Sequence, residues 1–385
     1  LQFLKRKNLF HLLRHEMLFQ DKKFAAKKNN AEQEAFYLSC FHYLIDFPYK
    51  YYDKKLTNTF GQKYLEYKNN CSESDKLYIK FHTLFSDINR MAARKNPRKS
   101  SGINLPELLK YEKELENSKH YLAAYYLYRS ICSYYTFYDK HPEKIIEYLQ
   151  KAIRLKDKIA FFFPVDIHVF LQLLYADALF NNSQVKDAET IYNAVFNSGV
   201  NENMYGYYYH CEQYILVSII QKKYEQAQTL LDKVFQPCID NKLDIYATRG
   251  AMSYVKLYLS NGELKKASNY LNTAKAINEK TFYLPFDVQL RVLENIYFFL
   301  KKDYDFSFQL ATRNMKFLKA QEQDDIFKNY MLLWRMIIGM INSMNKGNKL
   351  SAELVKDYEY LNKRYTNLYC DLLEQLYLQA VKEIR

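Results

Sequence analysis

The sequence predicts an all-α protein, a solenoid of about eight antiparallel helix pairs. A turn followed by a short amphipathic helix recurs along the chain, and its clearest copy is QKKYEQAQTLLDKVF at residues 221–235. The copies are about 40 residues apart, which is a period of helical-pair solenoids. The 385 residues contain 8 glycines and 7 prolines, fewer than the turns of a strand-rich fold require.

The repeat register depends on one small residue in the second helix of each pair. Aligning the copies there gives four anchors, separated by 39, 40 and 40 positions: Ala188, Ala227, Ala267 and Ser307. Apolar or aromatic side chains follow the anchors at three and four positions, which is one face of an α-helix. A tyrosine stands thirteen positions before three of the anchors, so the first helix repeats in the same register: Tyr175, Tyr214 and Tyr254.

These residues resemble the tetratricopeptide repeat family over roughly residues 118–320. The anchor is similar to the small residue that the family places where its helices approach closely, and Ala152 and Ala274 fall at its second alanine. The chain departs from the family in its first-helix tyrosine and in lacking the helix-terminating proline in these copies. The resemblance implies a right-handed superhelix whose first helices line the concave surface. It carries over no binding residue, because the family motif is structural.

Four regions are predicted along the chain. Residues 1–95 form a basic N-terminal helical region, with 20 Lys and Arg against 10 Asp and Glu in the first 100 residues. Residues 96–105 form a loop, since the surrounding stretch RMAARKNPRKSSGINLPE combines basic residues, prolines and serines with little to bury. Residues 106–345 form the tetratricopeptide-like repeats. Residues 346–385 form a C-terminal capping helix or helices, read as one long helix or a bent pair.

Within the repeats, residues 121–138 are apolar or aromatic on almost every side, so this helix is expected inside the stack. The helices that follow are expected in pairs: 142–156 with 165–181, 184–197 with 204–221, 224–236 with 243–260, 263–278 with 285–301, and 304–319 with 324–344.

Composition limits where the protein works and what it contacts. Six widely spaced cysteines without a C-x-x-C pair are typical of reduced, packing thiols in a cytoplasmic protein. The sequence contains no run of 18 or more apolar residues, so no membrane-spanning helix is predicted. The chain begins with leucine, so we expect its true N-terminus to be missing, which leaves a signal peptide open. The sequence does not determine the oligomeric state.

The search for chemistry predicts no catalytic residues, no metal site and no cofactor. No glycine-rich phosphate loop is present. His11 and His15 lack a third ligand nearby. His210 and Cys211 are adjacent on a predicted helix and point about 100° apart, so we interpret them as packing residues rather than a catalytic pair. The sequence therefore predicts that the protein is not an enzyme.

Two groups of residues are binding candidates. The first is a tyrosine-rich first-helix face that offers a groove for a peptide: Tyr205, Tyr207, Tyr208, Tyr209, Tyr214 and Tyr254. Packing between helices is the competing interpretation of the tyrosines that repeat in register. The second is a basic patch, for which a solvated loop is the competing interpretation: Arg90, Arg94, Lys95, Arg98 and Lys99.

The sequence as a whole predicts a non-catalytic scaffold that recognises a protein or peptide partner on the concave surface. One alternative is a sensory or regulatory module of a larger regulator, such as a transcriptional one. Another is nucleic-acid binding through the basic N-terminal quarter, which we expect to be weak because its basic residues alternate with apolar ones at packing spacing.

Overall fold

The fold is described from a computed structural model of the 385-residue chain. The described residues are 17–18, 59–60, 62–63, 73–92, 105–116, 118–139, 141–159, 166–200, 206–240, 244–281, 283–320, 327–369 and 371–384. Within these ranges every regular element is a helix and there is no strand, which confirms the all-α class. The chain divides into two compact units, with the boundary inside helix α10 (Asp166–Asn181) between Leu171 and Gln172.

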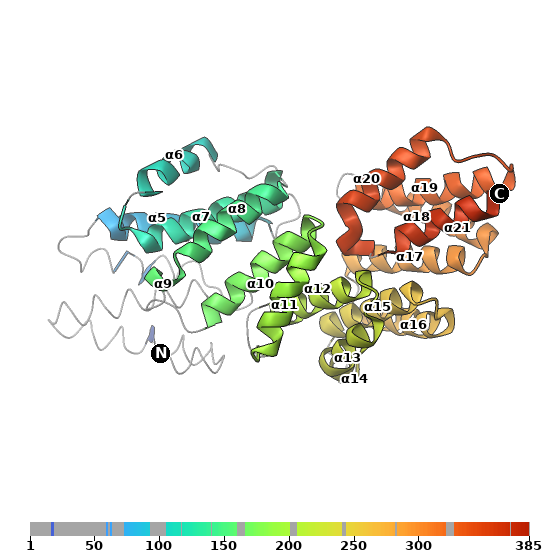
Figure 1. The fold of residues 1–385 in the computed structure, drawn as a ribbon, viewed down its shortest axis with the longest axis horizontal. Helices are drawn as coiled ribbons and strands as arrows, with labels where there is room; N and C mark the ends of the chain where they lie inside the picture. The colour runs from blue at the N-terminus through green and yellow to red at the C-terminus, as the bar shows by residue number, and fades with distance from the viewer. Residues whose placement is uncertain are drawn as a thin grey trace. The chain divides into compact units, whose positions relative to one another are not determined.

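The first unit contains the described helices on the N-terminal side of α10 (Figure 1). Their bounds are α5 (Glu73–Ala92), α6 (Leu105–Glu116), α7 (Tyr121–Tyr134), the π-helix η3 (Tyr135–Asp139), α8 (Pro142–Arg154) and α9 (Lys156–Ile159). Pro142 stands in the first turn of α8, where its missing N–H would be unpaired in any case.

Helix α7 is the core of the first unit. Ten of its residues between Ala123 and Ser133 are buried, as its all-round apolar sequence predicts. It packs on α5, where the rings of His82 and Tyr126 stack with centroids 3.9 Å apart. The Ser130 hydroxyl also donates to the Phe81 carbonyl at 3.4 Å.

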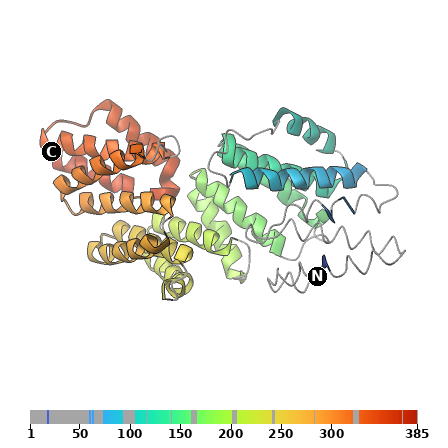
Figure 2. The same ribbon diagram turned by 180° about the vertical axis from the view of Figure 1, so that it is seen from behind.

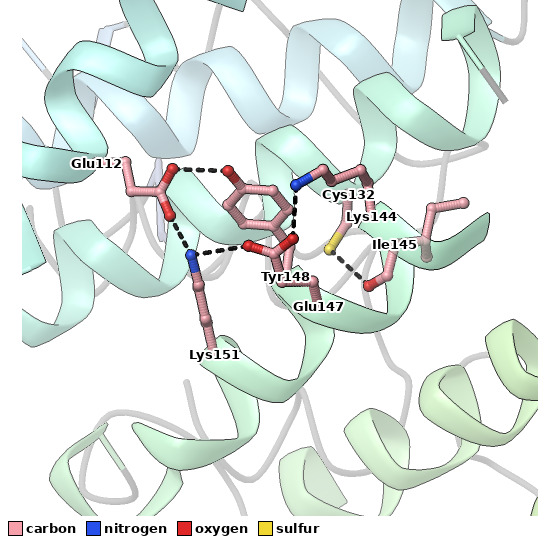
Figure 3. Close-up of polar contacts among 7 residues, drawn as sticks. All are labelled: Glu112, Cys132, Lys144, Ile145, Glu147, Tyr148 and Lys151. Atoms are coloured by element: carbon pink, nitrogen blue, oxygen red, sulfur yellow. Dashed lines mark hydrogen bonds and ion pairs between the residues drawn. The ribbon is translucent and has the colours of Figure 1, made fainter. Parts of the chain in front are cut away.

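Helices α6 and α8 are joined by a charged cluster around one carboxylate (Figure 3). Glu112 on α6 accepts a 2.6 Å hydrogen bond from the Tyr148 hydroxyl and pairs with the Lys151 ammonium at 2.5 Å. Lys151 also pairs with Glu147 at 3.1 Å. Burial, reinforced by Glu112, raises the pKa of Tyr148 above its usual range, so the hydroxyl remains a donor.

The second unit contains the helix pairs of the repeat. The pairs are α10 with α11 (Val185–Asn197), α12 (Tyr207–Ile220) with α13 (Tyr224–Val234), α15 (Asp244–Ser260) with α16 (Leu264–Thr281), α17 (Leu284–Leu300) with α18 (Tyr304–Ala320), and α19 (Lys328–Asn345) with α20 (Ala352–Tyr369). Each first helix thus pairs with the second helix that follows it across a short turn, whereas the sequence pattern grouped it with the second helix that precedes it. A short helix, α14 (Gln236–Asp240), follows α13. All four predicted anchors are 0% exposed, as close helix approach requires: Ala188, Ala227, Ala267 and Ser307.

The turns between paired helices share one backbone geometry. The residue five positions before each anchor has positive φ: Ser183 (61°), Lys222 (58°), Gly262 (76°) and Lys302 (67°). At the α12 turn, the Lys222 N–H donates to the Ile219 carbonyl and the Lys223 N–H to the Ser218 carbonyl, both at 2.8 Å. The same two bonds recur at the other three turns. This left-handed C-terminal cap ends the first helix at the same place in every pair.

The repeated turn makes glycine scanning informative. Lys222→Gly is expected to raise the free energy of unfolding by about 0.5–1 kcal/mol. Glycine relieves the strain of the left-handed conformation in the folded state, and the higher entropy of its unfolded chain offsets part of that stabilisation. Gly262→Ala is expected to lower it by about 1 kcal/mol through backbone strain, since an added Cβ there meets nothing within 4 Å. Urea unfolding followed by circular dichroism measures both, and shifts of the same sign would contradict the turn geometry.

The C-terminal region forms a pair of helices rather than one long helix. After α20, helix α21 (Leu372–Ile384) packs against first helices of the same unit, including α15 and α17. Gln375 Nε2 donates to the Ser260 carbonyl at 3.0 Å, and Gln379 Nε2 donates to the Phe299 carbonyl at 2.9 Å. Two glutamines one turn apart therefore satisfy carbonyls at the ends of α15 and α17. The orange-to-red helices lie together in both views (Figures 1 and 2).

The region boundaries predicted at residues 95, 105 and 345 stay predictions. No described helix is both long enough and apolar enough to span a membrane.

Candidate ligand-binding surface on the first helices

The predicted binding tyrosines separate into buried and exposed members. Tyr214 and Tyr254 are buried in the first helices α12 and α15. The Tyr214 hydroxyl donates to Asn193 Oδ1 on α11, and the Tyr254 hydroxyl donates to Asp232 Oδ1 on α13 at 2.5 Å. Each acceptor stands five positions after an anchor, so both tyrosines link a first helix to the second helix of the preceding pair.

Ring stacking accompanies these hydrogen bonds. The Tyr214 ring stacks on Phe196 with centroids 5.2 Å apart, and the Tyr254 ring stacks on Tyr270 at 4.2 Å. Burial, reinforced by Asp232, raises the pKa of Tyr254 above its usual range, so its hydroxyl stays protonated. In the structure, these two rings and their hydroxyls form helix-to-helix contacts.

The other members lie at the start of α12. Tyr207 is buried, Tyr208 is half-buried and Tyr209 is 38% exposed. Gly206 precedes them with φ of 78°, a left-handed conformation that glycine adopts without strain. Tyr205 lies outside the described residues, as do Arg94, Lys95, Arg98 and Lys99 of the predicted basic patch. Arg90 lies on α5, and its side chain is likewise outside the described set.

An exposed apolar surface joins the first turns of two neighbouring first helices. The rings of Tyr208 on α12 and Tyr246 on α15 stack with centroids 4.3 Å apart. Tyr246 is 40% exposed and Ile245 is 49% exposed. We call Tyr208, Tyr209, Ile245 and Tyr246 the aromatic edge. Sequence analysis missed its α15 half, because Ile245 and Tyr246 follow no tyrosine-rich run.

A charged pair borders the aromatic edge. The Arg249 guanidinium on α15 lies 5.5 Å from the Tyr209 ring centroid. Its Nε and Nη2 atoms lie 2.7 and 2.6 Å from Oε2 of Glu212 on α12, whose side chain is buried. This two-nitrogen contact to one carboxylate fixes the arginine against the tyrosine. The aromatic edge thus has a rigid polar border.

Behind this border lies a buried polar cluster that sequence analysis did not identify. Asp177 on α10 accepts a hydrogen bond from the Tyr192 hydroxyl of α11. Its other oxygen lies 2.8 Å from Nδ1 of His210 on α12. All three side chains are buried, so they join three helices and present little to a ligand. The one sequence signal is an aspartate within the apolar run FLQLLYADALF.

The aromatic edge and its Arg249–Glu212 border are suited to noncovalent binding of a ligand. Stacking rings bordered by an arginine–glutamate pair can hold extended peptide and aromatic side chains. Within the part of the chain that the structure describes, no group of three or more His, Cys, Asp or Glu residues is arranged to hold a metal ion.

Solved structures with a similar fold are known, although no protein-family model and no curated protein sequence matches the chain. One is the crystal structure of a Rap protein complexed with competence and sporulation factor, at 17% identity and a TM-score of 0.62, with 91% of this chain and 92% of that chain covered. A second is the apo form of RapI, at 13% identity and a TM-score of 0.53, with 92% and 97% covered. A third is aspartyl phosphate phosphatase F from Bacillus subtilis, at 12% identity and a TM-score of 0.52, with 92% and 94% covered.

These likenesses concern the fold. They confirm that the chain is an all-α helical-repeat protein of the tetratricopeptide-like kind, as its repeat register predicts.

Proposed function

We propose that this chain is a non-catalytic binding protein that recognises a peptide, or a peptide segment of a protein, on the surface of its first helices. The observation that carries the proposal is the aromatic edge, which leaves large apolar side chains exposed on two adjacent first helices. Tyrosine provides a large amphipathic contact area at low entropic cost. A similar fold is seen in a Rap protein complexed with competence and sporulation factor, which supports a peptide or protein ligand here.

The proposal ranks a binding role above an enzymatic one. Neither the sequence motifs nor the described residues bring together a nucleophile, a base and a stabilising group at an open site. Because one protein with a similar fold is an aspartyl phosphate phosphatase, the direct test is phosphate release from acetyl phosphate, a small acyl phosphate. Turnover above the rate of a buffer blank would contradict the non-catalytic proposal.

The cytoplasmic location and the two alternative functions predicted from the sequence also remain proposals. A cytoplasmic location agrees with Cys132, Cys211 and Cys238 being buried thiols in the described residues. Service as a sensory module of a larger regulator is compatible with peptide recognition. Nucleic-acid binding would depend on the predicted basic patch, whose side chains lie outside the described residues.

Removing rings from the aromatic edge is expected to weaken peptide binding. Tyr209→Ala and Tyr246→Ala should each reduce affinity for a mixture of N-terminally fluorescein-labelled random hexapeptides by about tenfold, which is about 1.4 kcal/mol. Fluorescence anisotropy measures the affinity. The matched control is Phe306→Ala, because Phe306 is also 38% exposed but lies on the second helix α18. Equal losses in all three variants, or none, would place the binding surface elsewhere.

A further inference from the structure

Exposed apolar side chains of the second unit gather where three first helices begin. In the described part of this unit, most of the exposed large hydrophobic side chains lie in the first turns of α12 and α15 or at the N-cap of α17: Tyr209, Ile245, Tyr246 and Tyr283. The others lie on α18, α20 and α21: Phe306, Tyr360 and Leu378. Tyr283 is 47% exposed and extends the aromatic edge to a third first helix. We call the aromatic edge together with Tyr283 the first-helix rim.

Tyr283 is held in place at the start of α17. Its backbone N–H donates to Oδ1 of the buried Asn278 on α16 at 3.4 Å. Its ring meets the buried Phe286 ring edge to face, with centroids 4.9 Å apart. Pro285 in the first turn fixes the local backbone. Tyr283 therefore presents its exposed ring from a fixed backbone position.

The rim repeats with the spacing of the first helices. Helix α12 packs on α15 and α15 packs on α17. The three run in the same direction, because an antiparallel second helix separates each from the next, so their starts lie at one end of the stack. Packed helices are about 8–10 Å apart. A ligand that crosses the rim therefore meets exposed aromatic or apolar side chains about every 8–10 Å.

That spacing selects one peptide conformation. A polyproline II helix has three residues per turn and rises about 3.1 Å per residue, so every third side chain lies on one face, about 9 Å from the next. An extended strand repeats a face every two residues, at about 7 Å, or every four, at about 13 Å. Only the polyproline II repeat matches the spacing of the helices. Surfaces lined by aromatic side chains are also a recurring type of site for such segments.

Two ion pairs lie beside the rim and leave no net charge of their own. On α15, Arg249 pairs with Glu212 of α12 at 2.6 Å. On α17, Asp287 stands one turn after Tyr283 and pairs with Arg291 at 2.7 Å. Both arginines are thus neutralised within the protein. Electrostatic complementarity then favours an uncharged ligand segment over an acidic or basic one.

We propose that the first-helix rim binds an uncharged, proline-rich segment in the polyproline II conformation, lying across α12, α15 and α17 with every third side chain against the rim. This inference rests on the proposed function and names the class of peptide. Tyrosine hydroxyls donate to the backbone carbonyls of the ligand, which a polyproline II helix leaves without internal hydrogen bonds. Because proline fixes the conformation beforehand, little conformational entropy is lost on binding.

Three N-terminally fluorescein-labelled nonapeptides test the conformation and the spacing. The first repeats Leu-Pro-Pro three times, which places its leucines on one face of a polyproline II helix. The second has the same composition, with leucine at its first, third and fifth positions, which distributes them over different faces. The third repeats Leu-Gly-Ser three times, which keeps the spacing on a flexible chain. Fluorescence anisotropy is expected to show that the first binds at least about tenfold more tightly than either of the others.

Substitutions in the rim test where this peptide lies. Tyr246→Ala and Tyr283→Ala should each weaken binding of the first nonapeptide by about tenfold. Tyr283→Ala is the decisive variant, because Tyr283 lies outside the aromatic edge. The matched control is Phe306→Ala, which should leave binding unchanged. Phe306 is exposed in the first turn of the antiparallel helix α18, at the opposite end of the stack from the rim.

The outcomes separate this inference from the proposed function. Equal affinity for the three nonapeptides, or unchanged binding of the first one by Tyr283→Ala, overturns the inference. The proposed function then stands if the random hexapeptide mixture still binds in a manner that depends on Tyr209 and Tyr246. Failure of the hexapeptide mixture and of every nonapeptide to bind the unaltered protein overturns both.

Discussion

Asp177→Ala is expected to lower the free energy of unfolding by about 3–5 kcal/mol, the largest effect among the substitutions considered. The carboxylate is buried, accepts the Tyr192 hydroxyl and lies 2.8 Å from His210 Nδ1. Removing it leaves two buried polar side chains without the group that they share. Urea unfolding followed by circular dichroism measures the loss.

The control for this prediction is an aspartate that lacks buried partners. Asp187 is exposed in the first turn of α11, so Asp187→Ala should cost less than about 1 kcal/mol through the helix dipole. A cycle with His210→Ala then tests the pair itself. The double variant should cost at least about 1 kcal/mol less than the sum of the single variants. Strict additivity would mean that Asp177 and His210 do not stabilise each other.

Leucine at a repeat anchor is expected to cost about 1–3 kcal/mol by overpacking. Ala227 and Ala267 are both 0% exposed in the second helices α13 and α16, so a larger side chain must displace a neighbouring helix. The comparison is Ala320→Leu at the exposed end of α18, which should change stability by less than about 0.5 kcal/mol. Thermal unfolding that is unchanged in both anchor variants would show that close helix approach occurs elsewhere.

The repeat register could be predicted because each helix pair packs mainly on its neighbours. A small anchor, an apolar stripe and a turn then recur at one spacing, and the structure buries all four anchors and gives all four turns positive φ. The same reasoning explains why Tyr214 and Tyr254 were ambiguous. Repetition in register marks a residue that neighbouring pairs use in the same way, and both tyrosines contact the preceding second helix.

The candidate site was predicted only in part. The tyrosine-rich start of α12 identified Tyr208 and Tyr209, which carry half of the aromatic edge. Its other half, Ile245 and Tyr246, depends on how far the first turn of α15 is left uncovered. The exposure of these two side chains depends on which neighbouring helices cover them, so the apolar periodicity within α15 does not predict it.

The sequence by itself determined the all-α class, the helices of the repeat and their spacing, because local patterns of small and apolar residues specify those features. Only the tertiary structure decided which polar residues are paired. Asp177 meets His210 from another helix, and α21 returns to cap the carbonyls of Ser260 and Phe299 more than 70 positions earlier in the chain. Pairing of charged and polar groups depends on contacts between segments far apart in sequence, and no local pattern encodes those contacts.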